Sequence, residues 1–229
     1  RLPKHLETEG VLSRLQTRSG RPAEPHEVNL LHTRKHIDRV EDAASGGVAM
    51  LDTPECVVSS GTYEAALHAV GAVLDAVVEV SDRQLDNAFC AARPPGHHAE
   101  SSRAMGFCLF NSVAVAAAHA LKNGASKVAI VDYDVHHGNG TQWMFYDDPR
   151  ILYVSTHQYP FYPGTGATVD IGRDAGEGRT LNVPLAAGAT DADYELVFTR
   201  LILPALRAFS PDLLLISAGY DAHERDPAH

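Results

Sequence analysis

The sequence predicts an α/β protein with an open, mainly parallel sheet and helices on both faces, arranged in three αβα layers. Short apolar runs alternate along the chain with longer segments of helical periodicity, and this alternation is typical of a sheet built from βα units. The apolar runs are continuous rather than alternating with polar residues, which indicates strands covered on both faces. Both observations favour a parallel sheet inside a sandwich of helices.

Four apolar runs fit the predicted strands, and each leads directly into a polar segment. They cover residues 88–92, 127–131, 151–155 and 213–217. In open parallel sheets, ligands bind beyond the carboxyl ends of the strands. The residues that follow each run are therefore the first place to search for a site.

Five segments between and around these strands fit helices. They cover residues 2–18, 62–80, 110–122, 141–146 and 191–209. Ser60 and Gly61 suit the start of the second segment, and Asn123 suits the end of the third. Thr190 can cap the last segment, in which Pro204 predicts a kink because proline lacks the amide hydrogen.

Composition restricts the class of protein. The 229 residues are 45% apolar and 21% charged, which fits a single globular domain over residues 1–229. No apolar run reaches the length of a membrane span and no signal peptide is visible, so we expect no membrane partner. The net charge of −10 argues against direct nucleic-acid binding. Three cysteines without metal-binding spacing predict reduced thiols and a cytoplasmic protein.

Polar clusters rich in histidine follow the predicted strands. His97 and His98 follow the first strand, and a run from Asp132 to Asn139 follows the second. Thr156 and His157 follow the third strand, whereas Asp221 and His223 follow the fourth. Because parallel strands end at the same edge of a sheet, we expect these clusters to converge on one active site.

The second cluster has the spacing of a metal site. Asp132, Asp134 and His136 lie at every second position, so an extended backbone directs all three side chains to one face. Asp134 and His136 can share one divalent ion, and Asp221 would complete a site of one nitrogen and two oxygens. This open donor set favours zinc, while iron, cobalt and manganese stay open on ligand type alone.

The tandem histidines fit proton transfer beside such a site. His97 and His98 follow a stiff Pro-Pro-Gly turn, and each needs a partner on its far ring nitrogen to fix its tautomer. Asp132 and Asn139 are the available candidates. The alternatives without a function are polar residues that only solvate the strand ends and histidines that only pack or face solvent. The two motifs in combination disfavour these alternatives.

Five ordered motifs resemble the zinc-dependent histone deacetylase superfamily, and most closely its class II and bacterial amidohydrolase branch. They are Arg-Pro-Pro-Gly-His-His-Ala at 93–99, Gly-Phe-Cys-Leu-Phe-Asn at 106–111, Asp-x-Asp-x-His-His-Gly-Asn-Gly at 132–140, Tyr-Pro-Gly-Thr-Gly at 162–166 and Ser-Ala-Gly-Tyr-Asp-Ala at 217–222. The resemblance covers about residues 25–225. It implies an arginase/deacetylase-like fold and the hydrolysis of acetylated amines.

The resemblance also implies roles for individual residues. Asp134, His136 and Asp221 match the ligands of one zinc ion. His98 matches the general base and acid, His97 its electrostatic neighbour paired with Asp132, and Asn139 the residue behind His98. Gly106, Phe107 and Tyr162 match the substrate channel. Potassium positions are implied at Asp132, Asp134, His136, Ser155 and Thr156, with a second set at Phe145, Asp148 and Ile151.

The sequence departs from the family pattern near both ends. The Gly-Gly-Tyr segment that carries the family's catalytic tyrosine does not occur, and the His-Pro-Glu-Arg lead-in is also missing. We therefore expect a domain that is incomplete at its C-terminus and at its N-terminus.

Several functional readings stay open on the sequence. The main hypothesis is a zinc hydrolase that acts on an acetylated lysine peptide or a small acetylated amine. The alternatives are a fragment that binds zinc and acetylated amines with little or no turnover, an acetylpolyamine amidohydrolase, and a binuclear arginase-like enzyme. The last is disfavoured by the Asp-x-Asp-x-His spacing. Assembly into a homo-oligomer is left open.

Overall fold

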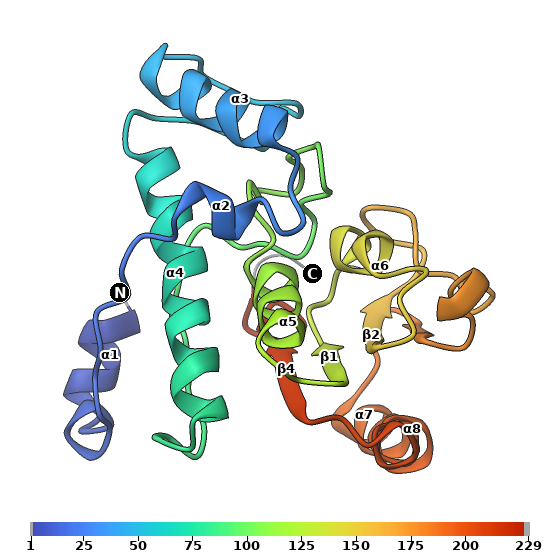
Figure 1. The fold of residues 1–229 in the computed structure, drawn as a ribbon. Helices are drawn as coiled ribbons and strands as arrows, with labels where there is room; N and C mark the ends of the chain where they lie inside the picture. The colour runs from blue at the N-terminus through green and yellow to red at the C-terminus, as the bar shows by residue number, and fades with distance from the viewer. Residues whose placement is uncertain (1, 227–229) are drawn as a thin grey trace.

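The computed structural model describes residues 2–226 and confirms the predicted α/β architecture (Figure 1). Four parallel strands form one sheet in the order β3-β2-β1-β4. The strands are β1 (Val128–Asp132), β2 (Ile151–Gln158), β3 (Thr180–Leu185) and β4 (Leu213–Ser217). Val128 lies opposite Ile151 on one side and Leu213 on the other, so β1 starts in step with both neighbours, and β2 continues beyond Ser155, the partner of Asp132.

Helices and turns make up the rest of the described chain. The helices are α1 (Leu2–Thr8), α2 (Pro25–Val28), α3 (Arg34–Ser45), α4 (Thr62–Ser81), α5 (Ser112–Lys122), α6 (Asn139–Met144), α7 (Asp191–Val197) and α8 (Leu203–Phe209). Two 3₁₀ turns cover Leu12–Arg14 and Asp174–Gly176, and a π turn covers Phe198–Ile202. None of these helices is long and apolar enough to cross a membrane.

The sheet separates two apolar cores because successive residues of a strand face opposite sides. Val128 and Ile130 of β1 pack in the larger core, which also contains residues of α3, α4 and α5. Ala129 and Val131 face the other side, where residues of the α7–α8 segment cover them. The result is the predicted three-layer arrangement, with α5 and α8 on opposite faces (Figure 1).

The three predicted strands after residue 120 are confirmed, and so are the main predicted helices. The helix predicted over 62–80 is α4, and that over 110–122 is α5, which begins after the cap Asn111. The segment predicted over 191–209 is α7, the π turn and α8 in succession. Pro204 lies in the first turn of α8, directly after the π turn, so the residue without an amide hydrogen stands where the helical hydrogen-bond pattern changes.

Two predicted elements are wrong. Residues 88–92 do not form a strand: the segment is mostly exposed, and no ladder pairs it with another strand in the part of the chain that the structure describes. Its apolar residues are present, but a strand also needs a hydrogen-bonding neighbour. The helix predicted over 2–18 ends at Thr8, where Gly10 adopts a positive φ of 65° and stops it.

Three elements were not predicted. Strand β3 contains Thr180, Asn182 and Pro184, so its sequence is not a continuous apolar run and resembles that of a loop. Helix α2 is a single turn, and α3 carries more polar residues than apolar ones. The signal for α3 was present in Thr33, whose hydroxyl accepts a hydrogen bond from the His36 amide at 3.3 Å as an N-terminal cap.

Strand β4 forms one edge of the described sheet. Leu213 and Leu215 are partly buried against the larger core. Leu214 and Ile216 face the other way and are 47% and 56% exposed, because the α7–α8 segment covers β1 and β2 and not β4. Only one side of β4 is therefore hydrogen-bonded, and only one face is covered.

Candidate active site

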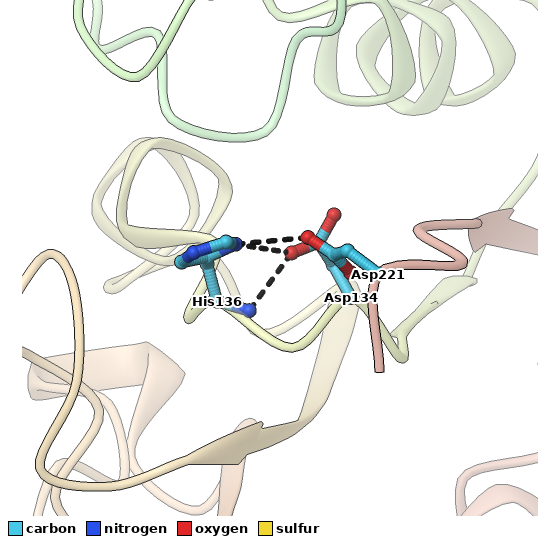
Figure 2. Close-up of side chains that lie close together, drawn as sticks. All are labelled: Asp134, His136 and Asp221. Carbon is cyan, nitrogen blue, oxygen red and sulfur yellow. Dashed lines mark hydrogen bonds and ion pairs between the residues drawn. The ribbon is translucent and has the colours of Figure 1, made fainter. Parts of the chain in front are cut away.

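The structure brings Asp134, His136 and Asp221 together at the carboxyl ends of β1 and β4 (Figure 2). One atom from each side chain lies within 4.8 Å of the other two. Nδ1 of His136 is 3.0 Å from Oδ1 of Asp134 and 3.0 Å from Oδ2 of Asp221. These are the three residues that the sequence predicted as metal ligands.

The main chain fixes the two carboxylates. Oδ1 of Asp134 accepts a hydrogen bond from the His136 amide at 2.8 Å, and Oδ1 of Asp221 accepts one from the Val135 amide at 3.0 Å. Gly219 lies so close to Asp134 that a Cβ at this position would collide with the carboxylate. The three donor groups are thus held in place by their own loops.

The charges of this cluster fit a cation. Burial alone would lower the pKa of His136, but hydrogen bonds and attraction from Asp134 and Asp221 raise it to about 9. The two carboxylates therefore create a negative potential that the imidazolium partly neutralises. One nitrogen and two carboxylate oxygens form a donor set suited to a divalent ion with a coordination position left open.

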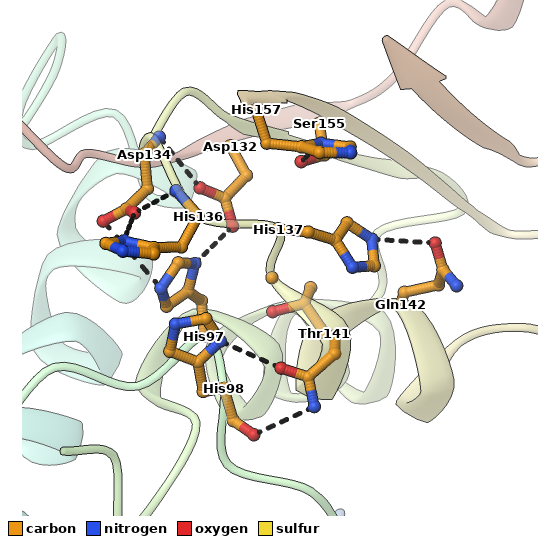
Figure 3. Close-up of polar contacts among 12 residues, drawn as sticks. His97, His98, Asp132, Asp134, His136, His137, Thr141, Gln142, Ser155 and His157 are labelled. Carbon is orange, nitrogen blue, oxygen red and sulfur yellow. Dashed lines mark hydrogen bonds and ion pairs between the residues drawn. The ribbon is translucent and has the colours of Figure 1, made fainter. Parts of the chain in front are cut away.

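His97 lies beside the cluster (Figure 3). Its Nδ1 donates to Oδ2 of the fully buried Asp132 at 2.9 Å, and its Nε2 is 3.8 Å from Oδ2 of Asp134. Burial would lower the pKa of His97, but the carboxylates of Asp132 and Asp134 raise it to about 9. The hydroxyl of Tyr153 also donates to Asp132 at 3.4 Å.

His98 is the neutral partner of this pair. Burial and the neighbouring His97 charge lower the pKa of His98 to about 3. The two rings lie 4.0 Å apart, and the ring of His98 is 6.0 Å from that of His136. Nδ1 of His98 is 2.9 Å from Oδ1 of Asn139, as predicted for its orienting partner. One charged and one neutral imidazole therefore flank the Asp134 side of the cluster.

Two of the three predicted channel residues, Gly106 and Tyr162, lie against His98. The main chain of Gly106 lies on the His98 ring so closely that no Cβ could fit. Tyr162 presents its ring edge-on at 5.0 Å from the His98 ring, and Phe107 is 63% exposed directly after Gly106. Phe161 adds a second wall, since its ring stacks on His136 at 5.0 Å with an interplanar angle of 15°.

Glu55 is a site residue that sequence reasoning missed. Its Oε1 accepts hydrogen bonds from the Gly106 amide at 3.2 Å and from the Tyr162 hydroxyl at 3.1 Å. One carboxylate oxygen thus connects the Gly106 and Tyr162 segments, which both lie against His98. A single glutamate in the loop between α3 and α4 offers no motif or periodicity by which it could have been found.

The residues predicted to bind potassium lie in two places. Asp132 and Ser155 are register partners on β1 and β2, next to the Asp134–His136–Asp221 cluster. Thr156 follows, and its buried hydroxyl makes no hydrogen bond. The second set lies on the turn before β2 and at the first residue of that strand, Ile151; in the turn the carbonyl of Phe145 accepts from the Asp148 amide at 3.0 Å. The structure brings the members of each set together.

A parallel α/β sheet with an Asp-His-Asp cluster and paired histidines beyond its strand ends defines a domain of the arginase/deacetylase fold. A family model described as "Histone deacetylase domain" matches residues 1–229. The chain belongs to this family.

Solved and curated relatives agree with this assignment. The crystal structure of the HDA15 HD domain superposes with a TM-score of 0.94 at 41% identity, covering 97% of this chain and 65% of that one. Histone deacetylase 15 of Arabidopsis thaliana is 42% identical over 97% of this chain, and Histone deacetylase 7 of Homo sapiens is 39% identical over 97%. The chain spans 41% and 27% of the lengths of these two curated proteins.

An archaeal relative is similar as well. A protein of Archaeoglobus fulgidus named "Probable deacetylase" is 41% identical over 86% of this chain, which spans 54% of that protein. Plant, human and archaeal sequences thus match the same region.

Proposed function

We propose that this chain hydrolyses N-acetyl amides of primary amines, either acetyl-lysine in proteins or a small acetylated amine, and releases acetate. The observation that carries the proposal is the neutral His98 next to the charged His97, both beside the Asp134–His136–Asp221 cluster. The names of the relatives support the same chemistry.

The donor set fits one zinc ion held by Asp134, His136 and Asp221. Zinc at this position would supply the positive charge that polarises a carbonyl group and makes water more acidic. Asp132, with Ser155 and Thr156, is the proposed region of a potassium ion, and the turn that contains Phe145, Asp148 and Ile151 is the proposed second one.

The two histidines divide the proton chemistry. His98 is neutral, and its Nδ1 is bound to Asn139, so its Nε2 is free to take a proton from the attacking water and return one to the leaving amine. His97 keeps its proton on the Asp132 side and supplies a fixed positive charge near the oxygen that becomes negative.

The aromatic residues fit an alkyl chain. Tyr162 and Phe161 cover His98 and His136 with apolar ring surface, and the Gly106 backbone packs directly on the His98 ring. This shape suits the methylene groups of an acetylated lysine or of a small acetylated amine such as an acetylpolyamine. The free thiols of Cys56, Cys90 and Cys108 fit the cytoplasm as the proposed location.

Acetate release from an acetyl-lysine peptide tests the proposal. We expect the zinc-loaded chain to release acetate, a chelator to stop the reaction, and His98→Ala to lower turnover about 10²–10⁴-fold. The exposed His5 provides a matched control, and His5→Ala should leave turnover unchanged. Undiminished turnover by zinc-loaded His98→Ala protein would contradict the assignment. Parallel assays with acetylspermidine distinguish the two substrate classes.

Recognition of acetylated amines with little turnover is the second candidate. The Tyr162 hydroxyl donates to Glu55 and is therefore not available to a negatively charged oxygen in the channel. Losing one oxyanion donor costs about 10²–10³-fold in rate. Binding of the acetyl-lysine peptide by zinc-loaded protein without acetate release would favour this candidate.

A further inference from the structure

A chain of hydrogen bonds leads from His98 through Asn139 to the carboxylate of Glu100. Nδ1 of His98 is 2.9 Å from Oδ1 of Asn139, and Nδ2 of Asn139 donates to Oε1 of Glu100 at 3.0 Å. His98 and Asn139 are both buried, and Glu100 is partly buried at the end of the chain. The Glu100 amide donates to the Arg103 carbonyl at 2.9 Å, which fixes the turn that carries the carboxylate.

The direction of this chain follows from what each group can do. A carboxylate only accepts hydrogen bonds, so Asn139 must direct its NH₂ group to Glu100. The carbonyl oxygen of Asn139 then faces His98, and His98 must carry its proton on Nδ1 to donate to it. In a neutral imidazole this leaves the lone pair on Nε2.

We propose that Glu100 is a positioning residue that sets the tautomer of His98 through the amide of Asn139. The inference rests on the proposed role of His98 as the base, because only Nε2 is then free to take a proton. Since Asn139 is itself neutral and can bond in either orientation, a charged acceptor beyond it is what makes one orientation favourable.

The other partners of the Asn139 NH₂ group are weaker. It approaches the His98 carbonyl at 3.5 Å and Sδ of Met105 at 3.3 Å. The first contact is long and the second is to a poor acceptor. The bond to Glu100 is both the shortest and the only one to an ionised group, so it contributes most to the orientation.

Reversing the hydrogen-bonding character of residue 100 tests the proposal. Glu100→Lys places a donor where the carboxylate accepts, so Asn139 should rotate its carbonyl to the lysine and its NH₂ group to His98. His98 must then accept at Nδ1 and carry its proton on Nε2. Nitrogen NMR shifts of the histidine side chains in the zinc-loaded chain report this tautomer, with the His98 signals assigned by their loss in His98→Gln.

A second substitution should restore the original state. In Asn139→Asp/Glu100→Lys, the aspartate can only accept from His98 while it pairs with the lysine, so the proton should return to Nδ1. Asn139→Asp alone leaves two carboxylates facing each other and should be the least stable variant of the set. Glu100→Gln can still accept from Asn139 and should keep the Nδ1–H tautomer.

We expect His98 to carry its proton on Nδ1 in the wild type and on Nε2 in Glu100→Lys. In the double variant the proton should be on Nδ1 again. An unchanged tautomer in folded Glu100→Lys, or Nε2–H in the wild type, would overturn the proposal. If Glu100→Lys does not fold by circular dichroism, Glu100→Leu decides: a mixture of tautomers supports the proposal and pure Nδ1–H overturns it. Because the readout is independent of turnover, absent deacetylation with the expected tautomers would contradict only the proposed function.

Discussion

At the scale of single residues, Glu55 joins Gly106 and Tyr162, two residues of the proposed channel wall, through one oxygen atom. Glu55→Ala removes the acceptor of both Gly106 and Tyr162, so the wall beside His98 loses its fixed position. We expect kcat/KM to fall about tenfold, because this factor corresponds to the free energy of one to two lost hydrogen bonds. Steady-state kinetics on the peptide used above measure the change.

Two further variants test whether the hydrogen bonds of Glu55 or its negative charge cause the effect. Glu55→Gln keeps an oxygen that can accept both hydrogen bonds and should retain most of the wild-type kcat/KM. Glu64→Ala removes an exposed glutamate from α4 and should have no effect. Equal kcat/KM for Glu55→Ala and the wild type would show that the wall does not depend on Glu55.

The predicted site residues are marked by predicted strand ends and sequence motifs, whereas the missed ones, Glu55 and Glu100, are not. Asp134 and His136 are two positions apart in the bend that follows β1, where the His136 amide also donates to Asp134, so their contact is local. The contacts of Glu55 span 51 and 107 positions, and the bond of Asn139 to Glu100 spans 39. No local pattern encodes such pairs, so they became visible only when the fold placed the loops side by side.

At the scale of secondary-structure elements, α4 depends on Gly71 for its contact with the preceding chain. A Cβ at Gly71 would collide with the Arg21 carbonyl and lie 2.8 Å from the Ala23 nitrogen. Gly71→Ala should therefore lower the free energy of unfolding by about 1–3 kcal/mol, although alanine favours a helix by about 1 kcal/mol. Denaturant titration measures the difference.

Gly61 provides the control for this substitution. It precedes α4 and has no heavy atom within 4 Å of an added Cβ, so Gly61→Ala should leave the free energy of unfolding nearly unchanged. Equal stabilities of the two variants would mean that the segment around Arg21 can move away from α4 without a loss of packing.

Local sequence patterns also predicted only some of the secondary-structure elements. Strands β1, β2 and β4 were predicted because they are continuous apolar runs, and α4 and α5 because they have apolar periodicity and clear ends. Residues 88–92 have the same apolar character and form no strand, whereas polar β3 does, because a strand is defined by its neighbour.

At the scale of the whole molecule, several histidines are buried in the neutral form. Burial lowers the pKa of His32, His98 and His137 to about 3 in each case. His32 lies away from the proposed metal ligands, and its Nε2 accepts from the Asn111 amide at 2.8 Å. Between pH 6.5 and about 3 the unfolded chain therefore binds protons that the folded chain does not.

The folded state should lose stability as the pH falls through this range. A depressed histidine pKa leaves stability complete above the unfolded value of 6.5 and removes it toward pH 3, by about 1.4 kcal/mol per pH unit for each such group. His32→Gln should make the slope shallower by about that amount. Urea titrations at several pH values measure how the free energy of unfolding depends on pH, and the exposed His5→Gln variant is the control. A wild-type pH dependence in His32→Gln as well as in His5→Gln would contradict the prediction.

The edge position of β4 affects the order in which parts of the structure unfold on heating. Asp221 follows this strand and lies 85 positions after His136, whereas Asp134, His97 and His98 depend on β1 and the turn before α5. Because β4 pairs with β1 alone in the described sheet and leaves one face uncovered, its detachment needs fewer contacts to break than global unfolding does. In the described part of the chain, local opening at this edge would displace Asp221, one of the proposed metal ligands, while the remaining fold stays intact, so we expect the proposed metal site to be lost before global unfolding.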